Sequence, residues 1–247
     1  MIIDSEGIGA LDEDTNHDSR IFSLALLLSS FFIYNSVGSI DENALENLSL
    51  IIHLTKNIQI TSDPSRQDYD EQDYSKYFPS FLWVVRDFTL QLIDQEGESI
   101  SSKEYLEKAL VLQKGFSDGV ENKNRIRRLL TTFFNERDCH TLVRPLTNEE
   151  ELQNLEKLEM DQLRPEFFEQ VIQLRRKILN RMKPKKINGK NLSGMMLAGL
   201  TRTYTNTINQ GAIPNIEDAW TYICKNESYK ACQQSIEKYE RTVKDIL

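Results

Sequence analysis

The sequence of 247 residues has few cysteines and no long apolar run, and each shortage excludes a class of protein. Cys139, Cys224 and Cys232 are too few and too widely spaced for a disulfide framework or zinc-ligand spacing, so we interpret them as structural side chains in a reducing compartment. The longest apolar run, residues 21–34, is interrupted by serines and is shorter than the ~20 residues that cross a bilayer. We find no signal-peptide or prenylation pattern, and we therefore expect a cytoplasmic protein without a transmembrane segment.

Basic charge is also scarce. The chain has 30 lysines and arginines against 38 aspartates and glutamates, which gives a formal net charge of −8. Domains that bind nucleic acid normally present a basic field, so we expect no nucleic-acid partner. The 39% hydrophobic and 28% charged residues are typical of a soluble globular protein, either one large domain or a domain with an appendage.

Apolar patterns predict strands in the first part of the chain and helices after it. Aromatic and β-branched residues cluster at 31–35 and 81–85, which predicts two interior strands, and a shorter strand is expected at 139–143. Amphipathic patterns and capping residues predict the helices. We expect helices at about 20–29, 41–60, 101–112, 122–134 and 165–182, a partly helical acidic stretch at 149–163, and helices from 192 to the end with a break at 211–214.

Two motifs carry charged residues at the ends of predicted strands. Met1-Ile2-Ile3 runs into Asp4-Ser5-Glu6-Gly7, and an apolar lead-in before Asp-x-x-Gly is typical of a strand that ends at the phosphate side of a nucleotide site. There the carboxylate faces a metal shell, and a glycine leaves its N–H open to an anion. A strand followed by an acidic turn is the more frequent explanation of so short a pattern.

The second motif is Arg86-Asp87, which directly follows the apolar run at 81–85. Open α/β sheets bind ligands at the carboxyl edge of their strands, so these two charges mark a candidate site. An ion pair that closes the strand is the alternative. Asn122-Lys123-Asn124-Arg125 looks like the guanine-reading Asn-Lys-x-Asp of small GTPases, but an arginine cannot accept hydrogen bonds, so we reject it.

Two basic stretches are interpreted as solvated surface. Arg125, Arg127 and Arg128 lie on the predicted helix at 122–134, and Lys183 to Lys186 form a loop that contains a proline. The acidic balance of the whole chain argues against a nucleic-acid patch at either place.

In combination, these segments resemble the guanylate-binding-protein branch of the dynamin-related large GTPases, with the atlastins as more distant relatives. The likeness covers essentially the whole chain and rests on residues 3–9, 26–38, 81–88 and 189–209 in this order. It implies a Ras-like α/β G domain with three layers and a mostly parallel sheet over residues 1–183. Residues 184–247 would then be a helical segment that completes the G domain and begins an all-α helical domain.

The resemblance also implies roles for individual residues. Asp4 would hold Mg²⁺ through a water, the Gly7 N–H would face the γ-phosphate, and Glu6 would help to orient the attacking water. An Arg-Asp pair after a strand reads the base in that family, so Asp87 would accept from guanine N1 and N2 while Arg86 packs beside the ring. The implied partner is a guanine nucleotide.

A further segment of the family is a loop that caps the guanine and serves dimerisation. Residues 144 to about 155 fall at its place. The resemblance therefore also implies a homo- or hetero-dimer formed through the G domain.

The phosphate-binding motif of such GTPases, Gly-x-x-x-x-Gly-Lys followed by Ser or Thr, occurs nowhere in the sequence. Gly189-Lys190 is followed by Asn191. In the family this loop and the first switch precede the Asp-x-x-Gly strand, so we expect a truncated product or a degenerate paralogue with impaired GTP hydrolysis. The missing strand would lie beside the present ones, and we expect it to leave Ile2, Ile3, Phe32 and Ile33 poorly covered.

The same absence supports a second hypothesis. The chain would then be a catalytically inactive interaction or dimerisation module that pairs with an intact GTPase relative.

Overall fold

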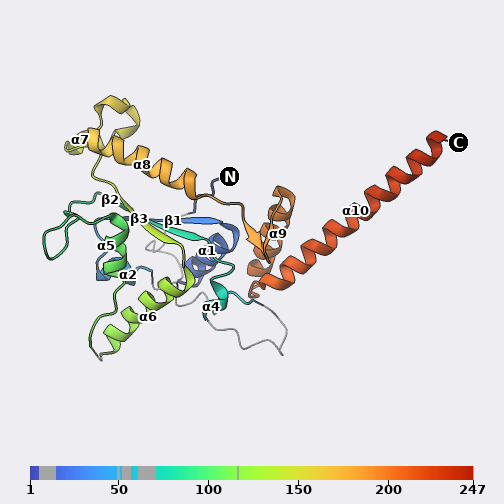
Figure 1. Cartoon of the computed structure of the whole chain (residues 1–247), viewed down its shortest axis with the longest axis horizontal. Coiled ribbons are helices and arrows are strands. Elements are labelled where there is room, and N and C mark those ends of the chain that lie inside the picture. Colours follow the sequence, from blue (N-terminus) through green and yellow to red (C-terminus); the bar gives the residue numbers. More distant parts are fainter. Residues whose placement is uncertain (6–14, 49–50, 52–56, 61–70, 116, 247) are drawn as a thin grey trace.

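A parallel three-stranded sheet forms the centre of the molecule (Figure 1). The computed structural model describes residues 1–5, 15–48, 51, 57–60, 71–115 and 117–246. Its strands are β1 (Phe31–Val37), β2 (Ser80–Arg86) and β3 (Arg137–Thr141), and β2 lies in the middle. All three predicted strands are confirmed, although β3 begins and ends two residues earlier than expected. Because β1 and β2 pair in register from their first residues, and β3 follows in parallel, the strands end at one common edge.

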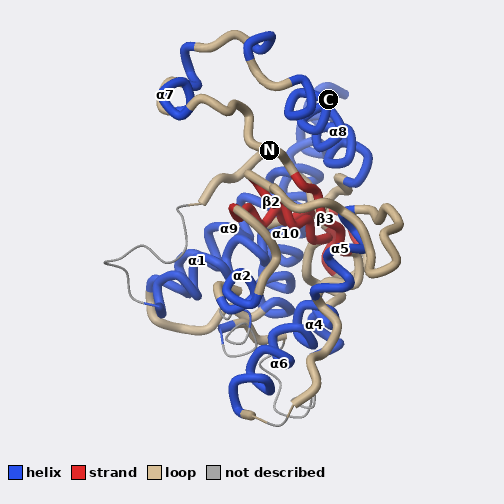
Figure 2. The backbone as a smooth tube through the Cα atoms, turned by 90° about the vertical axis from the view of Figure 1, so that its left-hand side faces the viewer, coloured by secondary structure: helices blue, strands red, loops and turns tan. Residues whose placement is uncertain are grey.

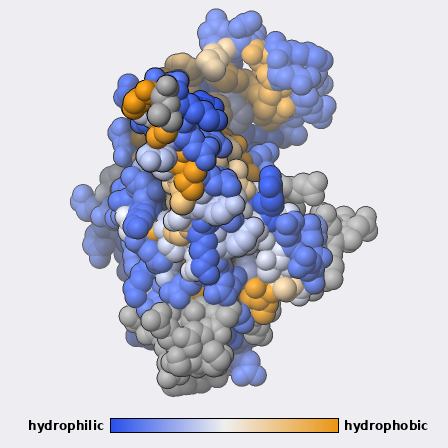
Figure 3. All heavy atoms as spheres, turned by 90° about the vertical axis from the view of Figure 1, so that its right-hand side faces the viewer, coloured by the Kyte–Doolittle hydropathy of each residue, from blue (hydrophilic) through white to orange (hydrophobic). Residues whose placement is uncertain are grey.

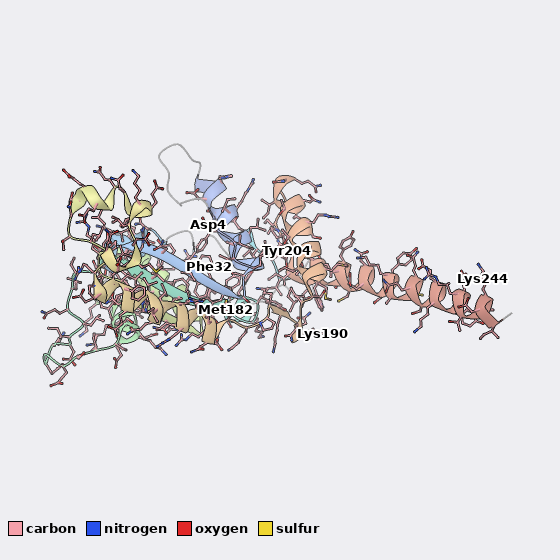
Figure 4. All side chains as sticks on the ribbon, turned by 90° about the horizontal axis from the view of Figure 1, so that it is seen from above. Asp4, Phe32, Met182, Lys190, Tyr204 and Lys244 are labelled. Carbon is pink, nitrogen blue, oxygen red and sulfur yellow. The ribbon has the colours of Figure 1, made fainter. Side chains whose placement is uncertain are left out.

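The strand predicted at Met1–Ile3 is wrong. Residues 1–5 form neither strand nor helix, and Ile2 and Ile3 are 95% and 57% exposed. An extended segment becomes a strand where a neighbour supplies partners for its backbone N–H and C=O groups. Within the described residues, β1 is paired only with β2, and Asp4 lies beside the sheet and not within it (Figure 4).

The three strands are buried to different degrees. Successive side chains of a strand point to opposite faces, and both faces of β2 are covered from Phe81 to Val85. Ile33 on β1 is 41% exposed, as expected for a strand that has a neighbour on one side only among the described residues. Phe32 was also expected to be poorly covered. This prediction is wrong, because its ring contacts Phe22 edge-on and stacks on Phe81.

Helices cover both faces of the sheet (Figures 1 and 2). The lower face in Figure 1 carries the main core, and the upper face carries a smaller core of Leu82, Val84 and Leu142 under α8 (Pro165–Arg181). The helices of the main-core side are α1 (Thr15–Leu28), α2 (Glu42–Glu46), α4 (Glu71–Tyr74), α5 (Ser102–Ala109) and α6 (Asp118–Phe133). The three layers agree with the predicted Ras-like α/β fold.

Helix boundaries follow the predictions in part. α5 begins with the predicted capping box, in which Ser101 Oγ accepts from the Glu104 N–H and Glu104 accepts from the Ser101 N–H, and it ends three residues early. α1 begins at Thr15, about five residues earlier than predicted. Asp18 and Ser19, which precede the predicted helix, are therefore buried residues within it.

The single helix predicted at 41–60 is wrong. α2 ends at Glu46, and Gln59 forms an isolated parallel bridge with Asn215. The apolar period that suggested one helix reflects burial instead, because Leu45 and Leu48 both point into the core. A 3.6-residue period over a short stretch therefore does not show that a helix continues along the whole of it.

The prediction that the arginines of α6 form a solvated face is wrong for one of them. Arg125 and Arg128 are exposed, but Arg127 is buried. Its Nε donates to Ala109 O at 3.0 Å, and its Nη2 pairs with the Glu42 carboxylate. Arg127 thus joins α6 to α2 and to the end of α5.

The acidic stretch and the C-terminal region agree with expectation. α7 (Glu149–Leu152) and the 3-10 turns η3 (Leu155–Lys157) and η4 (Met160–Gln162) precede α8. β4 (Lys186–Ile187) and β5 (Lys190–Asn191) form a hairpin about Asn188-Gly189, where both residues have a positive φ. α9 (Gly194–Asn209) and α10 (Ile216–Ile246) follow, with the predicted break between them.

α9 joins the C-terminal region to the sheet domain. Leu200 and Tyr204 are buried in the main core, and Ile216 and Ile223 of α10 belong to the same cluster (Figure 4 labels Tyr204). None of the helices in the described ranges combines the length and apolarity that a bilayer crossing needs.

The prediction that Lys183 to Lys186 form a solvated loop is wrong for Lys185. Its Nζ donates to Ser29 O at 2.8 Å and to Tyr77 O at 2.9 Å, and burial lowers the pKa of the ammonium to about 8. Ser29 precedes β1 and Tyr77 precedes β2. Lys185 therefore ties together the chain segments that enter these strands, at the amino edge of the sheet.

The cysteines are unpaired, as expected, but only one is a core residue. Cys139 is fully buried in β3, and burial raises the pKa of its thiol to about 12, so it is unreactive. Cys224 is half-buried and packs against the main core, whereas Cys232 is exposed on α10, so the interpretation as a structural side chain is wrong for Cys232 alone.

Candidate functional site

The predicted Arg86-Asp87 motif lies at the carboxyl edge of the central strand. Two backbone hydrogen bonds fix it: the Gly38 N–H donates to Arg86 O at 2.8 Å, and the Phe88 N–H donates to Leu142 O at 2.9 Å. Gly38 follows β1 and Leu142 follows β3. Asp87 is thus held between the ends of both neighbouring strands, which agrees with the predicted position at the ligand-binding edge.

Asp87 has an unusual backbone conformation. Its φ is +53°, in the left-handed region that most residues with a side chain avoid and that aspartate tolerates better than most. Such a conformation costs on the order of 1 kcal/mol, and it persists only where the surroundings impose it, often at functional sites. Within the described residues, the half-buried Asp87 side chain has no hydrogen bond or ion pair.

Arg86 is exposed and does not pair with Asp87. Its Nε donates instead to the Asn35 side-chain oxygen on β1 at 2.9 Å. The alternative in which an Arg86–Asp87 ion pair closes the strand is therefore not what the structure contains. Asn35 was not predicted as a site residue, because its position near the end of β2 follows only from the pairing of β1 with β2.

An open depression of about 490 Å³ lies next to Asp87, on the α8 side of the edge. Its walls are the segment after Asp87, the segment after β3 and two side chains near the start of α8: Phe88, Thr89, Leu90, Leu92, Thr141, Val143, Arg144, Arg164 and Gln170. Two guanidinium groups face this space, and each also contacts an exposed carboxylate. The depression therefore combines apolar walls with polar groups that can reorient, as ligand sites commonly do.

Gln170 on α8 holds the segment after β3 in place. Its Oε1 accepts from the Val143 N–H at 2.7 Å, and its backbone oxygen lies 2.8 Å from His140 Nε2. Burial lowers the pKa of His140, so the ring is neutral and donates to this carbonyl. Neither residue was identified from the sequence, since nothing in the local pattern links positions 140 and 170.

The segment expected to cap a base begins at the same place. From Arg144 the chain leaves the sheet, forms α7 and returns, and the Arg164 N–H donates to Pro145 O at 2.9 Å. This hydrogen bond joins the two ends of the excursion, and Arg144 and Arg164 both line the depression. Its role as a base cap or dimer contact stays a prediction.

The predicted phosphate and metal half of the site is less defined. Asp4 is exposed, and Glu6 and Gly7 lie outside the described residues. In the described part of the chain there is no group of three or more His, Cys, Asp and Glu side chains that could hold a metal ion. Mg²⁺ commonly binds through one or two carboxylates and the phosphates of a nucleotide, so a lone Asp4 fits this ion only with a nucleotide present.

Two protein-family models divide the chain between them. The N-terminal domain of guanylate-binding proteins matches residues 1–187, and their C-terminal domain matches residues 188–247. The junction falls in the β4–β5 hairpin, four residues after the boundary expected from the sequence. Residues from both matched ranges contribute to the main core, which includes Trp83 from the first range and Leu200 from the second.

Curated relatives match nearly the whole chain. Guanylate-binding protein 2 of Homo sapiens is 36% identical over 244 residues, which is 98% of this chain and 41% of the relative. Guanylate-binding protein 7 of Mus musculus is 37% identical over 242 residues, with 97% and 38% covered. The chain thus spans about two fifths of the length of these relatives. With the sheet, the Arg-Asp edge and both domain matches in agreement, the chain belongs to the guanylate-binding protein family of large GTPases.

Proposed function

We propose that this chain binds a guanine nucleotide at the sheet edge around Asp87. The observation that carries the proposal is a carboxylate without a partner in the described residues, held in a left-handed conformation between two strand ends. A carboxylate accepts two hydrogen bonds, which suits the N1–H and the 2-amino group of guanine. Adenine presents an acceptor at N1 and lacks the amino group, so the site should reject it.

Arg86 would support the base from the side of β1. Its guanidinium is tethered by Asn35 and is otherwise open to solvent, and a planar guanidinium packs well against an aromatic ring. The depression beyond Phe88 leaves room for the segment from Arg144 onward to close over the base. This arrangement would make the site selective for the base before any phosphate contact is counted.

For the phosphates and the metal, we propose the residues that the sequence predicts, although their positions are less well defined than that of Asp87. Asp4 would bind Mg²⁺ through a water, the Gly7 N–H would contact a phosphate oxygen, and Glu6 would lie near the attacking water. The sequence supplies no Gly-x-x-x-x-Gly-Lys motif, whose lysine and backbone N–H groups stabilise the developing charge in phosphoryl transfer. We therefore expect this chain to bind nucleotide with little or no GTP hydrolysis.

Calorimetric titration with GDP and ADP, each with and without Mg²⁺, tests the proposal. We expect the wild-type chain to prefer GDP, and Asp87→Ala to bind GDP about 100-fold more weakly because two charge-assisted hydrogen bonds are lost. Asp118→Ala is a matched control, since it removes an exposed aspartate at the start of α6. A wild-type chain that binds GDP and ADP equally, or Asp87→Ala binding GDP like the control, would overturn the assignment.

A second function follows from the missing phosphate-binding motif beside a retained Arg-Asp edge. We propose as the alternative that the chain is an inactive module that pairs with an intact GTPase of its family and alters its turnover. Mixing the chain with full-length human guanylate-binding protein 2 and measuring complex formation and GTP hydrolysis tests this directly. A chain that leaves both unchanged at concentrations well above the enzyme's would exclude it for that relative.

A further inference from the structure

A side chain of α8 reaches the sheet edge at which the guanine site is proposed. Gln170 lines the depression next to Asp87. Polar side chains are common on the surface of this molecule, and Figure 3 shows a face on which hydrophilic residues predominate. A polar side chain alone therefore does not mark a site. Gln170 differs from such residues because one end of its amide is fixed and the other end is unpaired.

The carbonyl end of the Gln170 amide is held by the backbone. Its Oε1 accepts from the Val143 N–H at 2.7 Å, and because a backbone N–H can only donate, the atom that faces it is the amide oxygen. The carbonyl of the preceding residue, Leu142, accepts from the Phe88 N–H at 2.9 Å. Gln170 is thus bound to the same short segment that holds the peptide after Asp87.

The amino end of the same amide has no partner. Within the ranges that the structure describes, Gln170 Nε2 donates no hydrogen bond, although it carries two hydrogens. The side chain is half-buried and lies in the wall of the depression. Because the bond to Val143 already restricts its rotamers, the side chain would lose less conformational entropy on binding a ligand than a free glutamine.

The two arginines of the depression are less suited to a fixed contact. Arg144 contacts Glu149 at 3.2 Å, and Arg164 contacts Glu166 at 3.6 Å. Each of these long side chains therefore has a competing carboxylate. Gln170 is the lining residue whose donor is both unpaired and held at the sheet edge by a backbone hydrogen bond.

A guanine bound by Asp87 would still have one polar group of its edge unpaired. The carboxylate would accept from N1–H and from the 2-amino group, while O6, the neighbour of N1, is an acceptor and needs a donor. Adenine carries an amino group in place of O6, which would set two donors against each other. A donor beside the Asp87 carboxylate would therefore strengthen the rejection of adenine.

We propose that Gln170 is a specificity-determining residue of the guanine site, in which Nε2 donates to O6 of the base while Oε1 stays bound to the Val143 N–H. Asp87 and Gln170 together match the order of acceptor, donor and donor along this edge of guanine. The inference rests on the proposed nucleotide site and adds a second base-reading residue from another element. α8 then contributes to base recognition as well as covering the sheet.

The variant Gln170→Glu isolates the proposed donor. Its carboxylate keeps an oxygen for the Val143 N–H, so the segment after β3 stays in place, but the two amide hydrogens are lost. Calorimetric titration should show about tenfold weaker GDP binding, because O6 would then face an acceptor. Gln173→Glu is the matched control, since it adds the same charge three residues away at an exposed position outside the depression. Thermal unfolding checks that both variants fold.

A modified base tests the contact at O6 itself. The 6-thio analogue of GDP keeps N1–H and the 2-amino group, but it replaces O6 with sulfur, which is a weak acceptor. The wild type should bind this analogue about fivefold more weakly than GDP, and Gln170→Glu should bind the two alike. A purely structural role of Gln170 would leave the preference for GDP over the analogue unchanged.

The outcomes distinguish this inference from the proposed site. A wild type without a preference for GDP over ADP, or a preference that survives Asp87→Ala, would overturn the guanine site and this inference with it. Where that preference exists and depends on Asp87, two results would overturn the role of Gln170 alone. One is GDP binding by Gln170→Glu that equals that of Gln173→Glu, and the other is an undiminished preference of Gln170→Glu for GDP over the 6-thio analogue.

Discussion

The two halves of the proposed nucleotide site lie in very different settings. Asp87 follows a strand that is buried on both faces, and backbone hydrogen bonds from Gly38 and to Leu142 fix the peptides around it. Asp4 lies in an exposed segment that belongs to no strand. Both residues were predicted from short motifs of the same kind, an apolar run followed by charge.

The difference shows what turns such a motif into a site. Arg86 and Asp87 gain a defined geometry from residues that are remote in sequence, about 50 positions away on either side, because the strands pair in parallel. Asp4 has no paired neighbouring strand in the described residues, so its position is not fixed by backbone pairing there. We expect base selectivity from this chain to be stronger than its hold on phosphate or metal.

Substitutions on the central and edge strands should show the largest contrast in stability. Leu82→Ala in β2 removes a fully buried side chain from the core under α8 and should lower the free energy of unfolding by about 2–5 kcal/mol. Ile33→Ala on β1 should cost less than about 1 kcal/mol, because that side chain is 41% exposed. Urea denaturation of both variants checks this, and equal losses would mean that β1 is covered in solution.

Measurements of GDP affinity should show directly how much Asp87 and Asp4 each contribute to nucleotide binding. Asp87→Ala should weaken GDP binding about 100-fold with or without Mg²⁺, because the base contact does not involve the metal. Asp4→Ala should weaken it tenfold or less, and only when Mg²⁺ is present. Titrations in EDTA and in Mg²⁺ give the four values needed. If Asp4→Ala were as damaging as Asp87→Ala, the phosphate half would be as well formed as the base half.

The amino edge of the sheet offers a pH-dependent test of how the strands are held. Burial lowers the pKa of Lys185 to about 8 in the folded chain, while an unfolded lysine titrates near 10.5. Between these values the unfolded chain binds the proton and the folded chain does not, so stability should rise with pH, and this gain is lost as the pH falls through 8. We expect the free energy of unfolding to rise by about 3 kcal/mol across this range.

Lys185→Met is the comparison that isolates this effect. The variant loses the donors to Ser29 O and Tyr77 O at every pH, which changes the overall stability, but it has no proton to release. The buried tyrosines, whose pKa values are raised, are present in both proteins and cancel in the difference. The stability of wild type minus Lys185→Met should therefore rise from pH 8 to 10; a flat difference would indicate a solvated ammonium.

β1 and β2 and their common edge were predictable because each contains a run of apolar residues and ends in a charge or a turn, whereas β3 is mostly polar and was placed two residues too late. The site residues that the sequence missed, Asn35 and Gln170, act only through partners on other elements. Arg127 and Lys185 were misassigned to the surface for the same reason. Their partners, Glu42 and the carbonyls before β1 and β2, are distant in sequence, and a local charge pattern does not reveal them.

The N-terminal strand failed for a different physical reason. Residues 1–3 have the composition of a strand, but a segment with this composition forms a strand only where a neighbouring strand pairs with it. The prediction of one helix at 41–60 failed similarly, since Leu45, Leu48 and Ile58 are buried although the helix α2 ends at Glu46.

The smallest predicted effect is a difference in stability between two variants of Asp87, which distinguishes the cost of its backbone conformation from the role of its carboxylate. Its φ of +53° disfavours an alanine but suits a glycine, so Asp87→Gly should be about 1 kcal/mol more stable than Asp87→Ala. Both variants should lose the preference for GDP over ADP equally, because both lack the carboxylate. Thermal unfolding gives the stability difference, and titration gives the selectivity. If Asp87→Ala were as stable as Asp87→Gly, the left-handed conformation would not be imposed by the strand ends, and the contrast with Asp4 would lose its structural basis.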